Sequence, residues 1–131
     1  MSNPELLNGS NLAFIGDAYY ELSIRKYLID KGITNQNELH KHCVKYVSAY
    51  GHHLIMQEIR KYLTEEELNI FKRGRNSKNK SRRINLKRID YLESTGFEAV
   101  IGYLYLKNNF QRLDELIDKS IHIIEEFYQN A

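Results

Sequence analysis

Very little in this sequence interrupts a helix. The 131 residues contain one proline, Pro4, and seven glycines, and long stretches pass without a cluster of turn-forming residues. Because proline and glycine are the residues that most often end helices and mark turns, their scarcity favours long helices. No segment of useful length alternates between apolar and polar residues as a half-buried strand does. We therefore expect one all-α domain over residues 1–131, with five to seven helices.

The first helices can be located from their end signals. Apolar residues recur with a helical spacing from about residue 11 to residue 31, and Gly32 follows as a suitable residue just past a helix C-terminus. A second helical region is expected over about 37–63. Tyr50–Gly51 is the expected break inside it. These segments make up roughly the first half of the chain.

Two later segments have the spacing of a helix N-cap. Thr64 is followed by Glu67, which is the capping-box pattern and predicts a helix that reaches residue 72 or 73. Asp90 and Glu93 have the same spacing, so we expect another helix to open there. That helix should break at Asn108–Asn109, and a final helix should follow it.

Positive charge is concentrated in one segment. Nine of the 17 residues from 72 to 88 are Lys or Arg and none is acidic, although the formal net charge of the whole chain is only +2. Residues 74–88 read as a long loop, and a concentrated cationic segment favours local contact with a polyanion. A solvated side chain is the better interpretation for any single lysine. As a unit, the candidate contacts with the polyanion are Arg73, Arg75, Lys78, Lys80, Arg82 and Arg83.

Several protein classes do not fit the sequence. A single cysteine, Cys43, cannot build a disulfide framework and suits a reducing compartment. No apolar stretch approaches the roughly 18–20 residues of a membrane span, and the first residues lack the pattern of a signal peptide. We expect a cytoplasmic protein without membrane contact.

Two carboxylates stand inside apolar runs. Asp17 lies in the run that begins at Leu12, and Glu98 lies in the run that continues to Leu106. Burying a charge costs several kcal/mol unless it is paired or bound to a metal. Each acid could instead cap a helix or face solvent, but two acids beside small residues favour an open pocket that suits Mg²⁺. Glu21 could join them, although an i,i+4 ion pair with Arg25 is the better interpretation.

Several segments together resemble a known family. The segment LAFIGDAYYEL at 12–22 resembles the signature helix of the ribonuclease III endonuclease domain, and residues 39–41 and 44–49 resemble its next helix. RGRN at 73–76 and TGFEAVIGYLYL at 95–106 resemble later segments of that domain. The order of these segments, the small size and the missing double-stranded RNA-binding domain are similar to the Mini-ribonuclease III subfamily.

This resemblance implies a helical homodimer that cuts double-stranded RNA. It implies Mg²⁺ as the cofactor, with Mn²⁺ as a substitute, and products with 5′-phosphate and 3′-hydroxyl ends. Asp17 matches the catalytic aspartate of the signature motif, and Glu98 matches the late catalytic glutamate; both would hold the metal. Thr95 would act on the metal through a bound water. The subfamily further implies maturation of 23S ribosomal RNA precursor, with a ribosomal protein as a helper.

Two positions depart from the full-length ribonucleases III. Those enzymes usually carry acids where this chain has Ala13 and Thr95, and the Mini subfamily is similar to this chain in lacking them. The departures leave open a second interpretation, a catalytically inactive duplex-RNA-binding protein associated with the ribosome. A helical protein-interaction module is a third, and it would have no salt-sensitive affinity for RNA.

Four histidines, together with the cysteine, raise the question of a transition-metal site. His40, His42, His52 and His53 lie close together in the sequence, with Cys43 among them. Zinc is the weaker interpretation, because one cysteine and histidines divided between helical segments do not match the usual ligand sets. A nucleophile built on Cys43 is weaker still, since this residue belongs to an apolar helical face.

Overall fold

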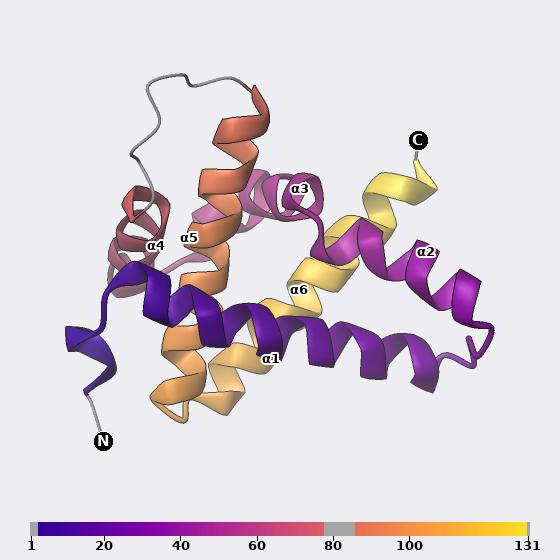
Figure 1. The fold of residues 1–131 in the computed structure, drawn as a ribbon, viewed down its shortest axis with the longest axis horizontal. Coiled ribbons are helices and arrows are strands. Elements are labelled where there is room, and N and C mark those ends of the chain that lie inside the picture. Colours follow the sequence, from indigo (N-terminus) through magenta and orange to yellow (C-terminus); the bar gives the residue numbers. More distant parts are fainter. Residues whose placement is uncertain (1–2, 78–85, 131) are drawn as a thin grey trace.

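The computed structural model describes residues 3–77 and 86–130, without the side chains of residues 86–88. The described residues form six α-helices and two short 3-10 turns, with no strand, so the all-α prediction is confirmed (Figure 1). The elements are η1 (Pro4–Leu6), α1 (Gly9–Asp30), α2 (Gln36–Val47), α3 (Ala49–Ile59), η2 (Arg60–Tyr62), α4 (Glu65–Asn76), α5 (Leu86–Leu106) and α6 (Phe110–Gln129).

Helix α5 is the centre of the fold. It contacts α1, α3, α4 and α6, and Figure 1 shows α1 crossing it. Every residue from Ser94 to Leu104 is buried except Glu98, which is half-buried. A helix that is apolar on all sides must be surrounded by other elements, and α5 meets that condition. Glu98 therefore lies at the one opening in the buried stretch of this helix.

The predicted helix ends with clear capping signals agree with the structure. Gly32 follows the end of α1 with a φ of 95°, and its N–H donates to the carbonyl of Ile29 at 2.9 Å. The N–H of Glu67 donates to the Thr64 hydroxyl at 3.1 Å, and the Glu67 carboxylate accepts the Thr64 N–H at 2.9 Å. The capping box at the start of α4 is confirmed.

Other predicted boundaries are wrong. Asp90 is not an N-cap, because α5 begins at Leu86 and Asp90 lies inside it. The break before α3 falls at Ser48 rather than at Tyr50–Gly51, because the Ser48 hydroxyl accepts the N–H of Gly51 and caps that helix. Helix α4 also continues to Asn76, into the stretch that the sequence suggested was loop.

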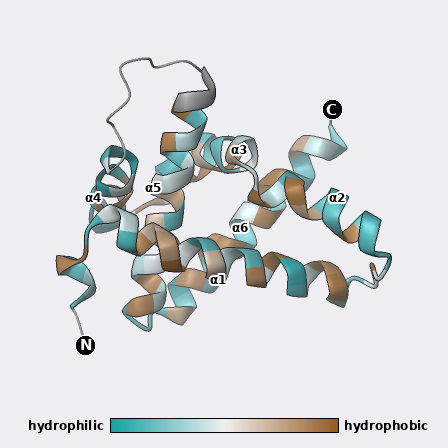
Figure 2. Ribbon diagram, viewed as in Figure 1, coloured by the Kyte–Doolittle hydropathy of each residue, from teal (hydrophilic) through white to brown (hydrophobic). Residues whose placement is uncertain are grey.

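Helix α1 carries apolar residues on its outer side as well as toward the core. Phe14 is 82% exposed and Leu22 64%, whereas Leu12 and Ile24 are completely buried. Figure 2 shows hydrophobic residues along the whole length of α1. The apolar residues of this helix are therefore divided between a side that faces the core and a side that does not. Separately, no helix in the described ranges has the length and apolar character needed to cross a bilayer.

Candidate active site

Helices α1 and α5 touch backbone to backbone where they cross. A Cβ added to Gly16 would lie 1.8 Å from the carbonyl oxygen of Glu98, and one added to Gly102 would lie 1.9 Å from the carbonyl oxygen of Leu12. Only glycine allows so close an approach, because any side chain at either position would overlap the facing helix. The sequence places glycine on both sides of the contact, and this fixes the spacing of the two helices.

Asp17 and Glu98 both belong to this crossing. Asp17 follows Gly16 directly, and Glu98 supplies the backbone against which Gly16 packs. The structure thus brings two residues that are 81 positions apart in sequence to one place on the surface. Glu98 is half-buried, and Asp17 is exposed.

The position of Asp17 is that of an accessible acid and not of a core residue. Successive residues of an α-helix are turned by about 100°, so Asp17 is directed away from the line of contact that Gly16 occupies. Within the described part of the chain, no lysine or arginine pairs with Asp17. An exposed carboxylate of this kind is accessible to a large ligand, which a core residue would not be.

The neighbours of the two acids have defined roles. The Thr95 hydroxyl donates to the carbonyl of Tyr91 at 3.1 Å, so this hydroxyl has only acceptor capacity left for a water. Ala13 is 6% exposed, at a position where an acid would be buried. Glu21 accepts a hydrogen bond from the Arg25 Nε at 3.0 Å, which confirms the predicted ion pair.

Of the six basic residues proposed to contact RNA, the structure describes Arg73 and Arg75. Arg73 donates to the carbonyls of Glu5 and Leu7 at 2.9 and 3.0 Å, so it fastens the N-terminal turn to α4. The Arg75 guanidinium lies 5.8 Å from the centre of the Phe71 ring. The remaining candidates lie outside the described residues: Lys78, Lys80, Arg82 and Arg83.

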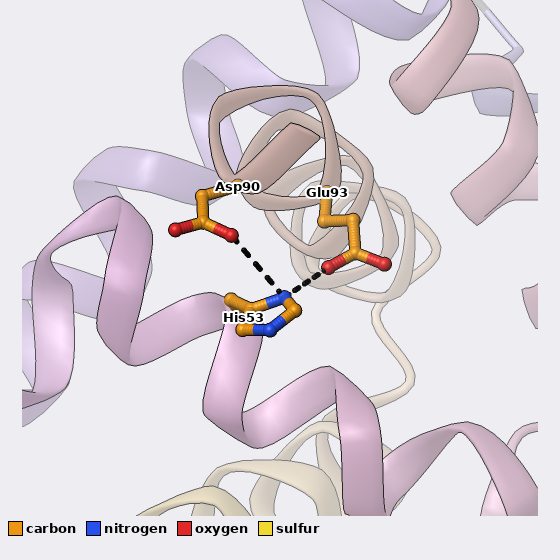
Figure 3. A group of neighbouring side chains, drawn as sticks. All are labelled: His53, Asp90 and Glu93. Carbon is orange, nitrogen blue, oxygen red and sulfur yellow. Dashed lines mark hydrogen bonds and ion pairs between the residues drawn. The ribbon is translucent and has the colours of Figure 1, made fainter. Parts of the chain in front are cut away.

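A second group of titratable side chains was not predicted from the sequence. His53 on α3 faces Asp90 and Glu93 on α5 (Figure 3). Its Nδ1 lies 2.6 Å from a carboxylate oxygen of Glu93 and 3.4 Å from one of Asp90. The signal available in the sequence was the i,i+3 spacing of the two acids, which also fits an N-cap, and the histidine comes from another helix.

Of the other candidates, His52 and Cys43 lie in the interior of the protein. His52 is completely buried, its Nδ1 lies 2.6 Å from the Ser94 hydroxyl, and burial lowers the pKa of its ring to about 3. Cys43 belongs to the core, and burial raises the pKa of its thiol. A thiol with a raised pKa forms little thiolate, which argues against a nucleophilic role.

The chain is similar to known ribonucleases. Residues 10–109 match the family model described as "Ribonuclease III domain". Mini-ribonuclease 3 of Clostridium tetani is 47% identical over 125 residues, which cover 95% of this chain and 83% of that protein. Mini-ribonuclease 3 of Streptococcus pneumoniae is 43% identical over a match that covers 95% of this chain and 99% of that protein. A protein from Fusobacterium nucleatum with a known crystal structure is 36% identical in sequence. The two structures align with a TM-score of 0.77 over 89% of this chain and 93% of that chain.

Proposed function

Because the chain belongs to the Mini-ribonuclease III group of the ribonuclease III family, we propose that it hydrolyses both strands of double-stranded RNA with Asp17 and Glu98 as its catalytic carboxylates. Family membership makes the protein a nuclease of the ribonuclease III type. The observation that carries the choice of residues is the crossing of α1 and α5, where Gly16 packs on the backbone of Glu98 and Asp17 is the next residue.

The two carboxylates fit a hard divalent cation. Asp17 is exposed and Glu98 half-buried, and carboxylate oxygens are the ligands that Mg²⁺ and Mn²⁺ accept most readily. Asp17 and Glu98 would hold the ion, with Thr95 accepting a hydrogen bond from a water beside it. A bound Mg²⁺ supplies a water of lowered pKa and neutralises charge that develops on the scissile phosphate.

The protein's own part in the reaction is positioning. The glycine contact holds α1 and α5 at a fixed separation, so the two carboxylates need little rearrangement when a phosphate arrives. Glu98 is anchored in a helix that is buried on both sides of it, which restricts its backbone. The exposed position of Asp17 leaves room for a duplex to approach.

The basic segment is proposed to hold the RNA. Duplex RNA is bound chiefly through its phosphates and 2′-hydroxyls, and lysines and arginines supply that contact. Since Arg73 already donates to two backbone carbonyls, the stronger candidates are Arg75, Lys78 and Lys80, together with Arg82 and Arg83. Reversing the charge of Arg82 and Arg83 together should weaken binding and flatten its dependence on salt. An unchanged salt slope would exclude them.

A homodimer is proposed because one site cuts one strand, and a double-strand cut needs two sites related by a two-fold axis. The outer side of α1 supports this proposal. Phe14, Leu22 and Ile29 are exposed there and are separated by eight and seven residues, or about two helical turns each, so they lie on one side of the helix. Light scattering on the Leu22→Glu variant should report a monomer where the parent protein is a dimer.

The physiological substrate is proposed to be the stem that joins the ends of 23S ribosomal RNA precursor, in the cytoplasm, with a ribosomal protein shaping the RNA. Relatives named Mini-ribonuclease 3 support the subfamily on which this proposal rests. Incubating the purified protein with such a stem and mapping both new ends would test it. Cleavage of only one strand, or at scattered positions, would contradict it.

The central experiment measures duplex RNA cleavage with Mg²⁺, with EDTA and single-stranded RNA of the same sequence as controls. Asp17→Asn and Glu98→Gln keep the size of each side chain but remove its charge, so each should lose cleavage by at least about 100-fold while retaining RNA affinity. Glu21→Gln is the matched control and should cleave normally. A fully active Asp17→Asn variant would refute the assignment, and RNA binding without cleavage by the parent protein would favour an inactive RNA-binding protein.

A further inference from the structure

We propose that His53, Asp90 and Glu93 form a second metal site, selective for a transition ion of the Zn²⁺ class, that fastens α3 to the first turns of α5. The three side chains offer one imidazole nitrogen and two carboxylate oxygens, all within 4.8 Å of one another. Figure 3 shows them converging from the two helices. The exposed fractions of the three side chains lie between 18% and 25%, so the cluster is sheltered but open to water.

Two of the three distances between the ligand atoms can be compared with those around a coordinated ion. Ligand bonds of about 2.1 Å in a tetrahedron place neighbouring ligand atoms about 3.4 Å apart. The His53 Nδ1 is already 3.4 Å from the Asp90 oxygen, and its 2.6 Å contact with Glu93 would need to open by about 0.8 Å. A rotation of the long Glu93 side chain is enough for that.

The surroundings of the three groups favour a cation between them. Nδ1 of His53 faces both carboxylates, so one ring position serves two acceptors. The amide nitrogen of Gln57 lies 3.1 Å from Nε2, the other ring nitrogen. With the amide group flipped, its oxygen would accept from the Nε2–H and fix the ring with Nδ1 toward the acids. Metal-binding histidines are commonly held in this way. Arg60 lies 3.7 Å from the second oxygen of Glu93; its positive charge opposes a further cation, but it leaves the Glu93 oxygen that faces His53 available.

The ligand set separates this site from the catalytic one in chemistry. Imidazole nitrogen suits Zn²⁺, Co²⁺ and related ions, whereas Mg²⁺ takes oxygen ligands and keeps much of its water. Three protein ligands and partial exposure leave a position for water, as in open zinc sites. We therefore expect Zn²⁺ to bind here in the presence of excess Mg²⁺.

The two sites are also separate in space. Glu93 and Glu98 are five residues apart on α5, which corresponds to about 7.5 Å along the axis and about 140° around it. Glu98 faces the crossing with α1, and Glu93 faces α3. The role of a bound ion would therefore be to stabilise the helix start that follows the basic segment.

The test is a titration of chelator-treated protein with Zn²⁺ by calorimetry, and with Co²⁺ by visible absorption. The parent protein and Asp17→Asn should each bind one equivalent per chain at the new site with equal affinity, and Zn²⁺ should raise the Tm of both. His53→Ala should weaken binding by more than about 100-fold. Glu93→Gln should weaken Zn²⁺ binding to the same extent. Its amide oxygen can still accept a hydrogen bond from His53, so this variant should keep the parental fold.

His122→Ala is the matched control, because His122 is an exposed histidine with an i,i+4 glutamate and lies outside the cluster. This variant should bind Zn²⁺ as the parent does. The proposal is overturned if the parent protein binds no equivalent of Zn²⁺, or if folded His53→Ala binds it unchanged. It is also overturned if Asp17→Asn loses the ion, since that result would place it at the α1–α5 crossing. None of these results depends on RNA cleavage.

Discussion

Gly16→Ala is the substitution that most directly tests how the fold sets the site. The added Cβ would lie 1.8 Å from the Glu98 carbonyl oxygen, where an ordinary carbon–oxygen contact is about 3.3 Å. Both atoms are fixed to backbone, so neither can rotate away. The helices must therefore separate by about 1.5 Å, the difference of those two distances.

The cost of that separation can be estimated. Forcing a methyl group into a packed site costs about 1–3 kcal/mol, and alanine returns up to about 1 kcal/mol through its helix propensity. With backbone on both sides we expect the upper part of that range, a net loss of about 2 kcal/mol in the free energy of unfolding. Asp17 moves with α1 while Glu98 stays on α5, and a misplacement of about 1 Å can lower a reaction rate about 100-fold.

Urea unfolding measures the first effect and single-turnover cleavage of duplex RNA measures the second, at a temperature where each variant is folded. Gly32→Ala is the control: it has a φ of 95° with nothing near its Cβ, so backbone strain costs about 1–2 kcal/mol far from the crossing. It should lose similar stability and keep the parental cleavage rate. A Gly16→Ala variant as stable and as active as the parent would refute this reasoning.

Three further predictions concern stability. Glu67 is buried and accepts from the Arg112 Nε at 2.8 Å, so Arg112→Ala should lower the free energy of unfolding by about 3 kcal/mol in urea titrations, whereas Glu115→Gln should cost less than about 1 kcal/mol. Burial alone would raise the pKa of Glu67, but hydrogen bonds from Arg112 and Thr64 outweigh it and lower that pKa. The stability from this pair is therefore present above the ordinary glutamate pKa, and the gap between parent and Arg112→Ala should narrow as pH falls below about 4.3; a constant gap would count against the pair. Thr64→Ala removes the cap of α4 and should cost about 1 kcal/mol, and an unchanged urea midpoint would contradict that role. Because burial lowers the pKa of His52 to about 3, the unfolded chain binds the extra proton from about pH 6.5 downward, so the parent should lose stability in that range, and His52→Gln should show a shallower slope.

Local signals predicted the parts of the fold that depend on neighbouring residues. The capping box of Thr64 and Glu67 and the left-handed Gly32 each act within one helical turn, so their sequence patterns are sufficient. Asp90 and Glu93 show the limit of such patterns. The same i,i+3 spacing occurs at an N-cap and on the inner face of a longer helix. Here the two acids lie inside a longer helix, on the side that contacts His53.

The outer side of α1 could not be predicted from periodicity. Phe14 and Leu22 are as apolar as the core residues of the same helix, and the pattern of apolar residues does not separate a stripe facing α5 from a stripe facing outward. Only the glycines make the distinction. Gly16 and Gly102 identify the sides of α1 and α5 that meet, because the close backbone contact excludes every larger residue.

The same glycines explain why the two acids stand out in the sequence. Gly16 precedes Asp17 directly, and Gly102 follows Glu98 by four residues, which is about one helical turn. Each acid is therefore tied by local helix geometry to a glycine at the crossing, and the crossing ties the two helices together. Moving either glycine by one position would turn the contact by about 100° and separate the acids, although the composition of the chain would be unchanged. The spacing of glycine and carboxylate on each helix, rather than the apolar run around it, is thus the feature that links this sequence to a two-carboxylate site.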